Sequence, residues 1–167
     1  NVTMVDNTCF EKDYSCSASI VIVGSNTQIL DSKIIQNSNR TNNFIFIDGA
    51  PVFRNVQITD NTVHNSIIHK QESYLSYNGS SAMLDNVTIY NNSYGDVWST
   101  ISGSGWSEES NPLIIINSII WDEEVNAIED DYWGDSLLLL YCNYGENWLT
   151  DSGDPTACIQ YSDLNMS

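Results

Sequence analysis

Short runs in which apolar and polar residues alternate recur along the chain. They span 53–60, 84–91 and 115–122, and the two steps between them are both 31 residues. Residues two apart in a strand share a face, so Val56 and Ile58 lie together and the residue between them points away. The runs are too short for helices and rich in β-branched residues. They predict one short strand per repeat and almost no helix.

The repeat length indicates a stacked architecture. A weaker copy of the run lies 23 residues upstream, with Ser32 and Ile35 at the positions of Asn55 and Ile58, and another begins 24 residues downstream of the third run, at Leu139. A parallel β-helix has roughly 20 to 30 residues per coil and tolerates longer turns, whereas propeller blades need about 40 residues. We therefore predict an all-β fold, a parallel β-helix of about five coils. It forms one domain over 1–167, in which 1–19 is an N-terminal, disulfide-bearing segment and 20–163 form the coils.

An asparagine returns at the same place in each of the three runs. Asparagine at a bend between two strands tolerates left-handed backbone angles and can hydrogen-bond its own turn. Stacked on the asparagine of the next coil, it can extend a ladder of amides. The spacing predicts an asparagine ladder made of Asn55, Asn86 and Asn117.

The repeats also resemble those of a known group of proteins. The segments "RNVQITDN", "DNVTIYNN" and "NSIIWD" are similar to the repeats of right-handed parallel β-helix proteins of the pectate-lyase-like fold, especially secreted surface proteins with polymorphic-outer-membrane-protein-type repeats. The segment 117–163, with "NSIIW", "YCNY", "GDP" and "YSD", is similar to their last coils. The resemblance covers roughly residues 20 to 163 and implies a right-handed winding. Because many activities occur on this fold, it implies no particular function.

The charge of the chain excludes two classes of partner. Among 167 residues, 22 are acidic and 5 are basic, which gives a formal net charge of −17. So few cations cannot build the basic patch that nucleic acid or an anionic membrane requires. The longest apolar run, 137–141, is far too short to span a bilayer, so we expect no membrane insertion. The chain opens inside a sequon, and we expect it to be processed or to be a segment of a longer protein.

The cysteines indicate an oxidising compartment, extracellular or at the cell surface. No two have CxxC spacing and both histidines lie far from them in sequence, so disulfides are favoured over a zinc site. A short covalent loop near each end of the stack would limit fraying of the terminal coils. The alternative for Cys142 is a small buried residue at the position of Val56. The favoured pairs are Cys9–Cys16 and Cys142–Cys158.

Sequons of the type N-x-[ST] predict covalent N-glycans. They matter only on a surface exposed in a glycosylating secretory system. Asn39 and Asn78 lie in loop-like insertions and are the best candidates, whereas Asn86 has the ladder as its alternative role. The predicted sites are Asn39, Asn78, Asn91, Asn86, Asn1 and Asn165.

A group of carboxylates between 122 and 135 raises the question of a metal. Hard oxygen ligands suit Ca²⁺. No EF-hand or nonapeptide calcium spacing is present, so an acidic surface insertion is the favoured interpretation and calcium the alternative. No other cofactor is expected. The weak calcium candidates are Asp122, Glu123, Glu129, Asp130 and Asp131.

The sequence contains no recognisable catalytic cluster. Arg54 and Lys33, the basic residues on or near strands, do not stand in a cluster of acids, so we assign no catalytic residue. Tryptophans and tyrosines crowd the C-terminal half, and aromatic faces can stack on sugar rings.

Two classes of function remain. The favoured one is an extracellular structural or interaction β-helix, a glycosylated subunit of a surface layer, adhesin or filament. Its open ends should contact another copy or a neighbouring domain. The alternative is a glycan-binding or polysaccharide-degrading domain of the lyase or hydrolase type.

Overall fold

The fold is made of parallel strands. The computed structural model describes residues 2–5, 7–9, 18–24, 27–39, 43–71, 81–95, 99–104, 113–122, 126–129, 137–140, 143–144, 148–149 and 159–160. Within these residues every regular element is a strand, and the paired strands run parallel to one another. The prediction of an all-β fold is confirmed. Among the same residues, no helix is long and apolar enough to cross a membrane.

The strands belong to three sheets. Sheet A contains β1 (Thr3–Val5), β4 (Gln28–Ile35), β7 (Val52–Thr59), β10 (Ala82–Tyr90), β13 (Leu113–Ile116), β14 (Ile119–Trp121), β16 (Leu137–Leu140), β17 (Asn143–Tyr144) and β19 (Ile159–Gln160). Sheet B contains β2 (Thr8–Cys9), β5 (Ser38–Asn39), β8 (Thr62–Val63) and β11 (Ser93–Tyr94). Sheet C contains β3 (Ala18–Gly24), β6 (Asn43–Gly49), β9 (Ile68–Gln71), β12 (Ser99–Ser104), β15 (Asn126–Glu129) and β18 (Trp148–Leu149).

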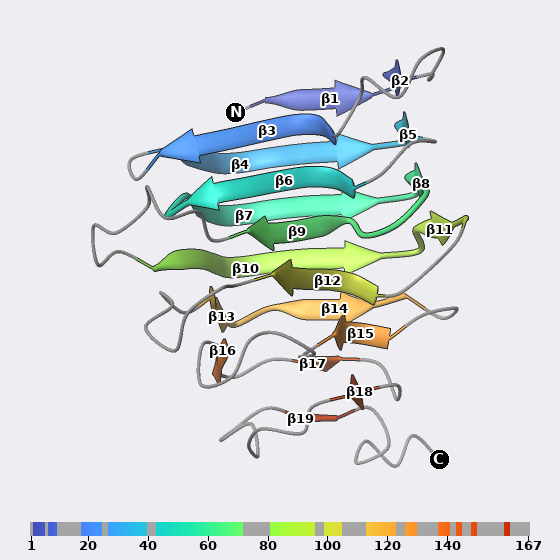
Figure 1. The fold of residues 1–167 in the computed structure, drawn as a ribbon. Coiled ribbons are helices and arrows are strands. Elements are labelled where there is room, and N and C mark those ends of the chain that lie inside the picture. Colours follow the sequence, from blue (N-terminus) through green and yellow to red (C-terminus); the bar gives the residue numbers. More distant parts are fainter. Residues whose placement is uncertain are drawn as a thin grey trace.

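The order of the strands is that of a parallel β-helix. From β1 to β12 the chain visits sheets A, B and C in turn, and each return to a sheet adds a strand beside the previous one (Figure 1). The main path of sheet A runs β1-β4-β7-β10-β14-β17-β19, which is longer than the predicted stack of about five coils. Because β1 and β2 already pair with β4 and β5, the coils begin before residue 20, where the sequence predicted their start. The right-handed sense of the winding stays a prediction.

Apolar side chains stack in columns inside the coils. The register aligns Met4, Ile34, Ile58, Ile89 and Ile120 on successive strands of sheet A. All but Met4, which lies at the end of the column, are buried. Burying one such side chain contributes about 1.5 to 3 kcal/mol, so the column is a main source of stability.

The upstream repeat is aligned one residue away from the predicted register. Val56 pairs with Ser32 and Ile58 with Ile34, so the step is 24 residues and not 23. A slip of one residue exchanges the two faces of a strand. Accordingly Ile34 is buried and Ile35, which was predicted at this position, is only partly buried. The downstream step of 24 is confirmed, because Ile115 pairs with Leu139.

Candidate interaction surfaces

The bend asparagines lie on the outside of sheet A. Asn55, Asn86 and Asn117 have φ angles of 56°, 54° and 50°, which are the left-handed angles that asparagine tolerates. Asn86 Nδ2 donates to Asn55 Oδ1 over 2.8 Å, and Asn55 Nδ2 donates to Asp31 Oδ1 over 2.7 Å. Asn117 donates instead to Asp85 Oδ1 over 3.3 Å. The exposed ladder therefore consists of Asp31, Asn55 and Asn86. Asn117, the predicted third asparagine, bonds to Asp85 and not to Asn86.

A second column of left-handed residues follows at the end of the same strands. Gln36, Asp60 and Asn91 have φ angles of 57°, 58° and 54°. Asn91 Nδ2 donates to Asp60 Oδ1 over 2.6 Å. All three side chains are exposed, so this column and the first one flank the outer face of sheet A.

Gln36 is the residue of this column least suited to its backbone angle. A residue other than glycine, asparagine or aspartate loses roughly 1 to 2 kcal/mol in the left-handed region. We expect Gln36→Asn to raise the free energy of unfolding by about 0.5 to 1 kcal/mol, measured by urea denaturation. The matched change Gln57→Asn, on exposed strand backbone, should give no gain. An equal effect at the two positions would contradict the backbone explanation.

A second asparagine ladder, which the sequence analysis missed, runs through the interior. Asn37 donates its backbone N–H and Nδ2 to Asn61 Oδ1 over 2.9 and 3.0 Å. Asn61 donates in the same way to Asn92 Oδ1 over 3.0 and 2.9 Å. The free hydrogen of Nδ2 reaches backbone carbonyls, for example that of Ile34 at 3.1 Å from Asn61. All three asparagines are buried, so this ladder satisfies polar groups that water cannot reach.

Asp122 is the last member of the interior ladder among the described residues. It follows β14 directly and is buried, and its Oδ1 accepts the backbone N–H of Asn92 over 2.8 Å. Its Oδ2 accepts the hydroxyl of Thr100 over 3.1 Å and the phenol of Tyr94. Burial raises the pKa of the Asp122 carboxyl, and hydrogen bonds from Tyr94 and Asn92 oppose this rise. Burial, and then the charge of Asp122, raise the pKa of the Tyr94 phenol, which therefore remains a donor.

The raised pKa of Asp122 gives the stability a pH dependence of known sign. When folding raises the pKa of a carboxyl, the protonated group contributes stability to the fold. This contribution is complete below the ordinary pKa of about 3.9, and it is lost as the pH rises through the pKa of the folded state. We expect Asp122→Asn, which keeps an acceptor for Asn92, to gain stability relative to the parent between about pH 4 and pH 7.5.

Urea denaturation at the two pH values measures this difference. Tyr94→Phe is the matched variant of opposite sign, because it removes a hydrogen bond that favours the charged carboxylate. It should deepen the loss of stability at the higher pH. A parent and an Asp122→Asn variant with the same pH profile would contradict the assignment.

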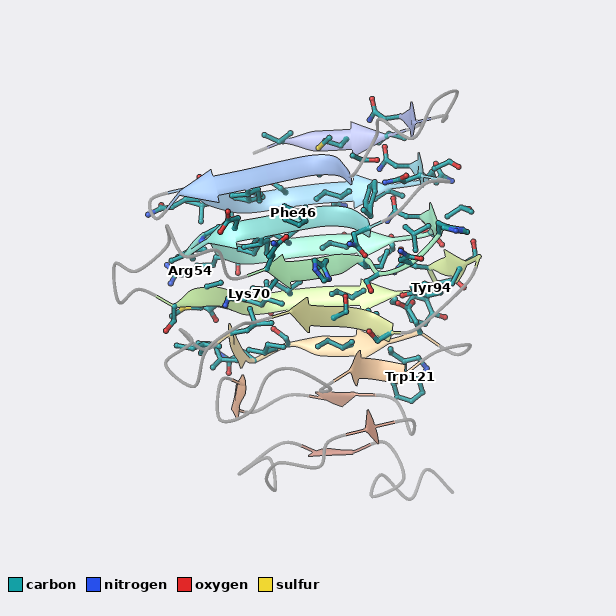
Figure 2. All side chains as sticks on the ribbon, viewed as in Figure 1. Phe46, Arg54, Lys70, Tyr94 and Trp121 are labelled. Atoms are coloured by element: carbon teal, nitrogen blue, oxygen red, sulfur yellow. The ribbon has the colours of Figure 1, made fainter. Side chains whose placement is uncertain are left out.

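The outer face of sheet A carries an aromatic pair. Tyr90, which is 48% exposed, pairs in register with Trp121 on the next strand, about 4.8 Å away along the stack. Ile119, on the same face, is also exposed. Trp121 lies at the carboxyl end of the strands, away from Arg54, which forms an ion pair with Asp85 at 2.8 Å (Figure 2). The face therefore has an apolar, aromatic end and a polar end.

A chain of hydroxyls and an imidazole lies on sheet C. Ser66 Oγ donates to Ser102 Oγ over 2.7 Å, and Ser102 Oγ lies 2.8 Å from Nδ1 of His69, whose ring stacks on Phe46. Burial lowers the pKa of His69, which favours the neutral ring, and the tautomer of that ring decides whether Nδ1 accepts from Ser102 or donates to it. Serine and histidine are residue types of nucleophilic catalysis. Ser102 is buried, however, and we interpret the chain as structural.

Of the predicted glycosylation sites, Asn39 is contradicted by the structure, whereas Asn86 and Asn91 have exposed side chains. The Asn39 side chain is fully buried and its Nδ2 donates to the Asn43 carbonyl over 2.8 Å, which leaves no room for a glycan on that nitrogen. Asn86 and Asn91 are exposed, on opposite sides of the outer face of sheet A. Three predicted sites, Asn1, Asn78 and Asn165, lie outside the described residues.

The predicted disulfides and most calcium candidates lie outside the described residues as well. For Cys9 in β2 and Glu129 in β15 the strand is described but the side chain is not. Among the described residues, no group of three or more His, Cys, Asp or Glu side chains could hold a metal ion. Asp122, the one calcium candidate whose side chain is described, accepts hydrogen bonds from protein donors. Those that lie outside are Cys16, Cys142, Cys158, Glu123, Asp130 and Asp131.

Comparison with known proteins identifies no family for this chain. No family model matches the chain, and no curated protein or solved structure shows a significant match. The resemblance to polymorphic-outer-membrane-protein-type repeats stays a prediction. Function must therefore be argued from the surfaces themselves.

Proposed function

We propose that this chain is a structural and interaction module, an extracellular glycosylated β-helix in a surface layer, adhesin or filament. The observation that supports it most is the edge of sheet A at β1. Among the described strands β1 pairs only with β4. Val5, its last residue, and Val2, which precedes it, are 40% and 57% exposed. An unpaired strand edge with exposed apolar residues is a template for another chain.

The exposed sequons support the glycosylated, extracellular part of the proposal. Asn86 and Asn91 each present an exposed amide. Glycopeptide analysis of the native material should find a glycan on at least one of them and none on buried Asn39. A glycan on Asn39 would contradict the burial of that side chain, whereas bare asparagine at both Asn86 and Asn91 would contradict this part of the proposal.

The state of association tests the proposal directly. Sedimentation velocity over a wide concentration range should show elongated assemblies that grow with concentration, and electron microscopy should show stacks joined at their ends. Monodisperse monomers at every concentration would contradict a filament-forming or layer-forming role.

The aromatic pair supports a second candidate, the binding of glycans. Pyranose rings stack on aromatic faces. Tyr90 is exposed and Trp121, which is partly buried, lies beside it on the adjacent strand. Affinity electrophoresis in polysaccharide gels, with a lyase and hydrolase assay on the same polymers, tests it. Trp121→Ala and Tyr90→Ala should abolish retardation, and the exposed control Gln57→Ala on the same face should not.

A further inference from the structure

In the described part of the chain, the interior asparagine ladder begins at Asn7. Asn7 donates its backbone N–H and its Nδ2 to Asn37 Oδ1, each over 2.9 Å. Its Nδ2 also lies 3.3 Å from the Val5 carbonyl. Within the described part of the chain, no donor meets its own Oδ1, and the side chain is exposed. Among the residues that the structure describes, the ladder therefore finishes at this end with an acceptor.

The rest of the ladder shows what such an acceptor binds. The Oδ1 atoms of Asn37, Asn61 and Asn92 each receive two donors, the backbone N–H and Nδ2 of the asparagine one coil earlier. Each asparagine stands two residues after the end of a strand of sheet A. Asn7 stands in the same relation to β1. By this pattern, the group that donates to Asn7 Oδ1 is an asparagine that stands two residues after a further parallel strand.

The same end of the stack offers the two other surfaces that such a coil needs. Among the described strands, β1 lies at the end of sheet A, with β4 as its one partner (Figure 1). Met4, the first member of the column that continues with Ile34, is only partly covered. A further strand would pair with the edge of β1, and its inward side chain would cover Met4.

We propose that the β1 end binds one further parallel coil, a strand followed two residues later by an asparagine that donates to Asn7 Oδ1. This proposal rests on the proposed interaction function and names the chemistry of the partner. The direction of the hydrogen bonds in the ladder also excludes one partner, the same end of a second copy of this chain. The same end of a second copy would bring a second Asn7 acceptor against the first, with no donor between them.

A peptide that carries this chemistry is the probe. A labelled peptide with the sequence of residues 52–63 contains β7 and Asn61, with the correct spacing between them. Its matched control carries Asn61→Leu, which removes the side-chain donor. Fluorescence anisotropy measures the binding of each peptide to the full chain and to a chain with Asn7→Leu. Asn7 is exposed at the end of the stack, so this variant should fold, which circular dichroism checks.

The proposal predicts a defined pattern in these four measurements. Each single change should weaken binding about tenfold, the effect of losing a hydrogen-bonded pair. The two changes together should weaken it no further than one alone, because they remove the same contact. Additive losses, equal binding of the two peptides, or no binding of the parent peptide would overturn the proposal.

Failure of this inference can be told apart from failure of the proposed function. A chain that assembles in sedimentation but does not distinguish the two peptides retains its interaction role and has a different contact. A chain that neither assembles nor binds the peptide loses both.

Discussion

Replacing Ile58 by aspartate should unfold the chain at neutral pH, whereas the same change at the adjacent Gln57 should leave it folded. Ile58 is fully buried between Ile34 and Ile89. The variant loses about 1.5 to 3 kcal/mol of apolar burial and places a carboxylate in the core at a cost of several kcal/mol more. A domain of this size has a total stability of roughly 5 to 15 kcal/mol.

Circular dichroism and urea denaturation measure this effect. Gln57 is exposed on the same strand, so Gln57→Asp controls for the added charge and for the lower strand propensity of aspartate. Two variants with the same denaturation midpoint would contradict the assignment of the inner and outer faces of β7.

Replacing Asn61 by leucine should cost roughly 3 to 5 kcal/mol, although leucine is apolar and similar in size. Asn61 accepts two donors from Asn37 and donates to Asn92 and to the carbonyls of Ile34 and Thr59. The variant leaves these buried groups without partners, and each one costs about 1 to 3 kcal/mol.

The matched control is Asn55→Gly in the exposed ladder. Its amide is open to water and glycine adopts the left-handed angle without strain, so the change should cost less than about 1 kcal/mol. Chemical denaturation of both variants gives the comparison. An Asn61→Leu variant as stable as Asn55→Gly would mean that the interior ladder does not support the fold.

The strand pattern and the bends could be predicted from the sequence because both leave local signals. Val56 and Ile58 alternate with polar residues, and Asn55 recurs where the backbone must turn left-handed. The upstream register could not be chosen in this way. Ile34 and Ile35 are adjacent and equally apolar, and only the pairing with β7 decides which one points inward.

The interior ladder was missed because an inward-pointing asparagine contradicts the expectation of an apolar core. Asn61 and Asn92 each follow another turn-forming residue, so the local sequence around them is typical of a polar turn. The signal was nevertheless present. The steps from Asn37 to Asn61 and from Asn61 to Asn92 are 24 and 31 residues, equal to the steps of the strands.

The site of Asn39 shows a different limit. Its sequon lies in a polar stretch and was interpreted as an exposed loop. In the structure its side chain turns inward and closes the corner towards β6 through the Asn43 carbonyl. Burial at such a corner depends on the coils above and below, and a local sequence pattern does not contain that information.

The exchange rates of the asparagine side-chain amides test the central claim most directly, namely that one asparagine in each turn hydrogen-bonds to the next inside the coils. Two-dimensional nuclear magnetic resonance in deuterated solvent resolves each Nδ2 pair. We predict slow exchange for Asn37, Asn61 and Asn92, which are buried, and fast exchange for the exposed Asn55 and Asn86. Equal, fast exchange of all five would contradict the ladder and the open end that we infer at Asn7.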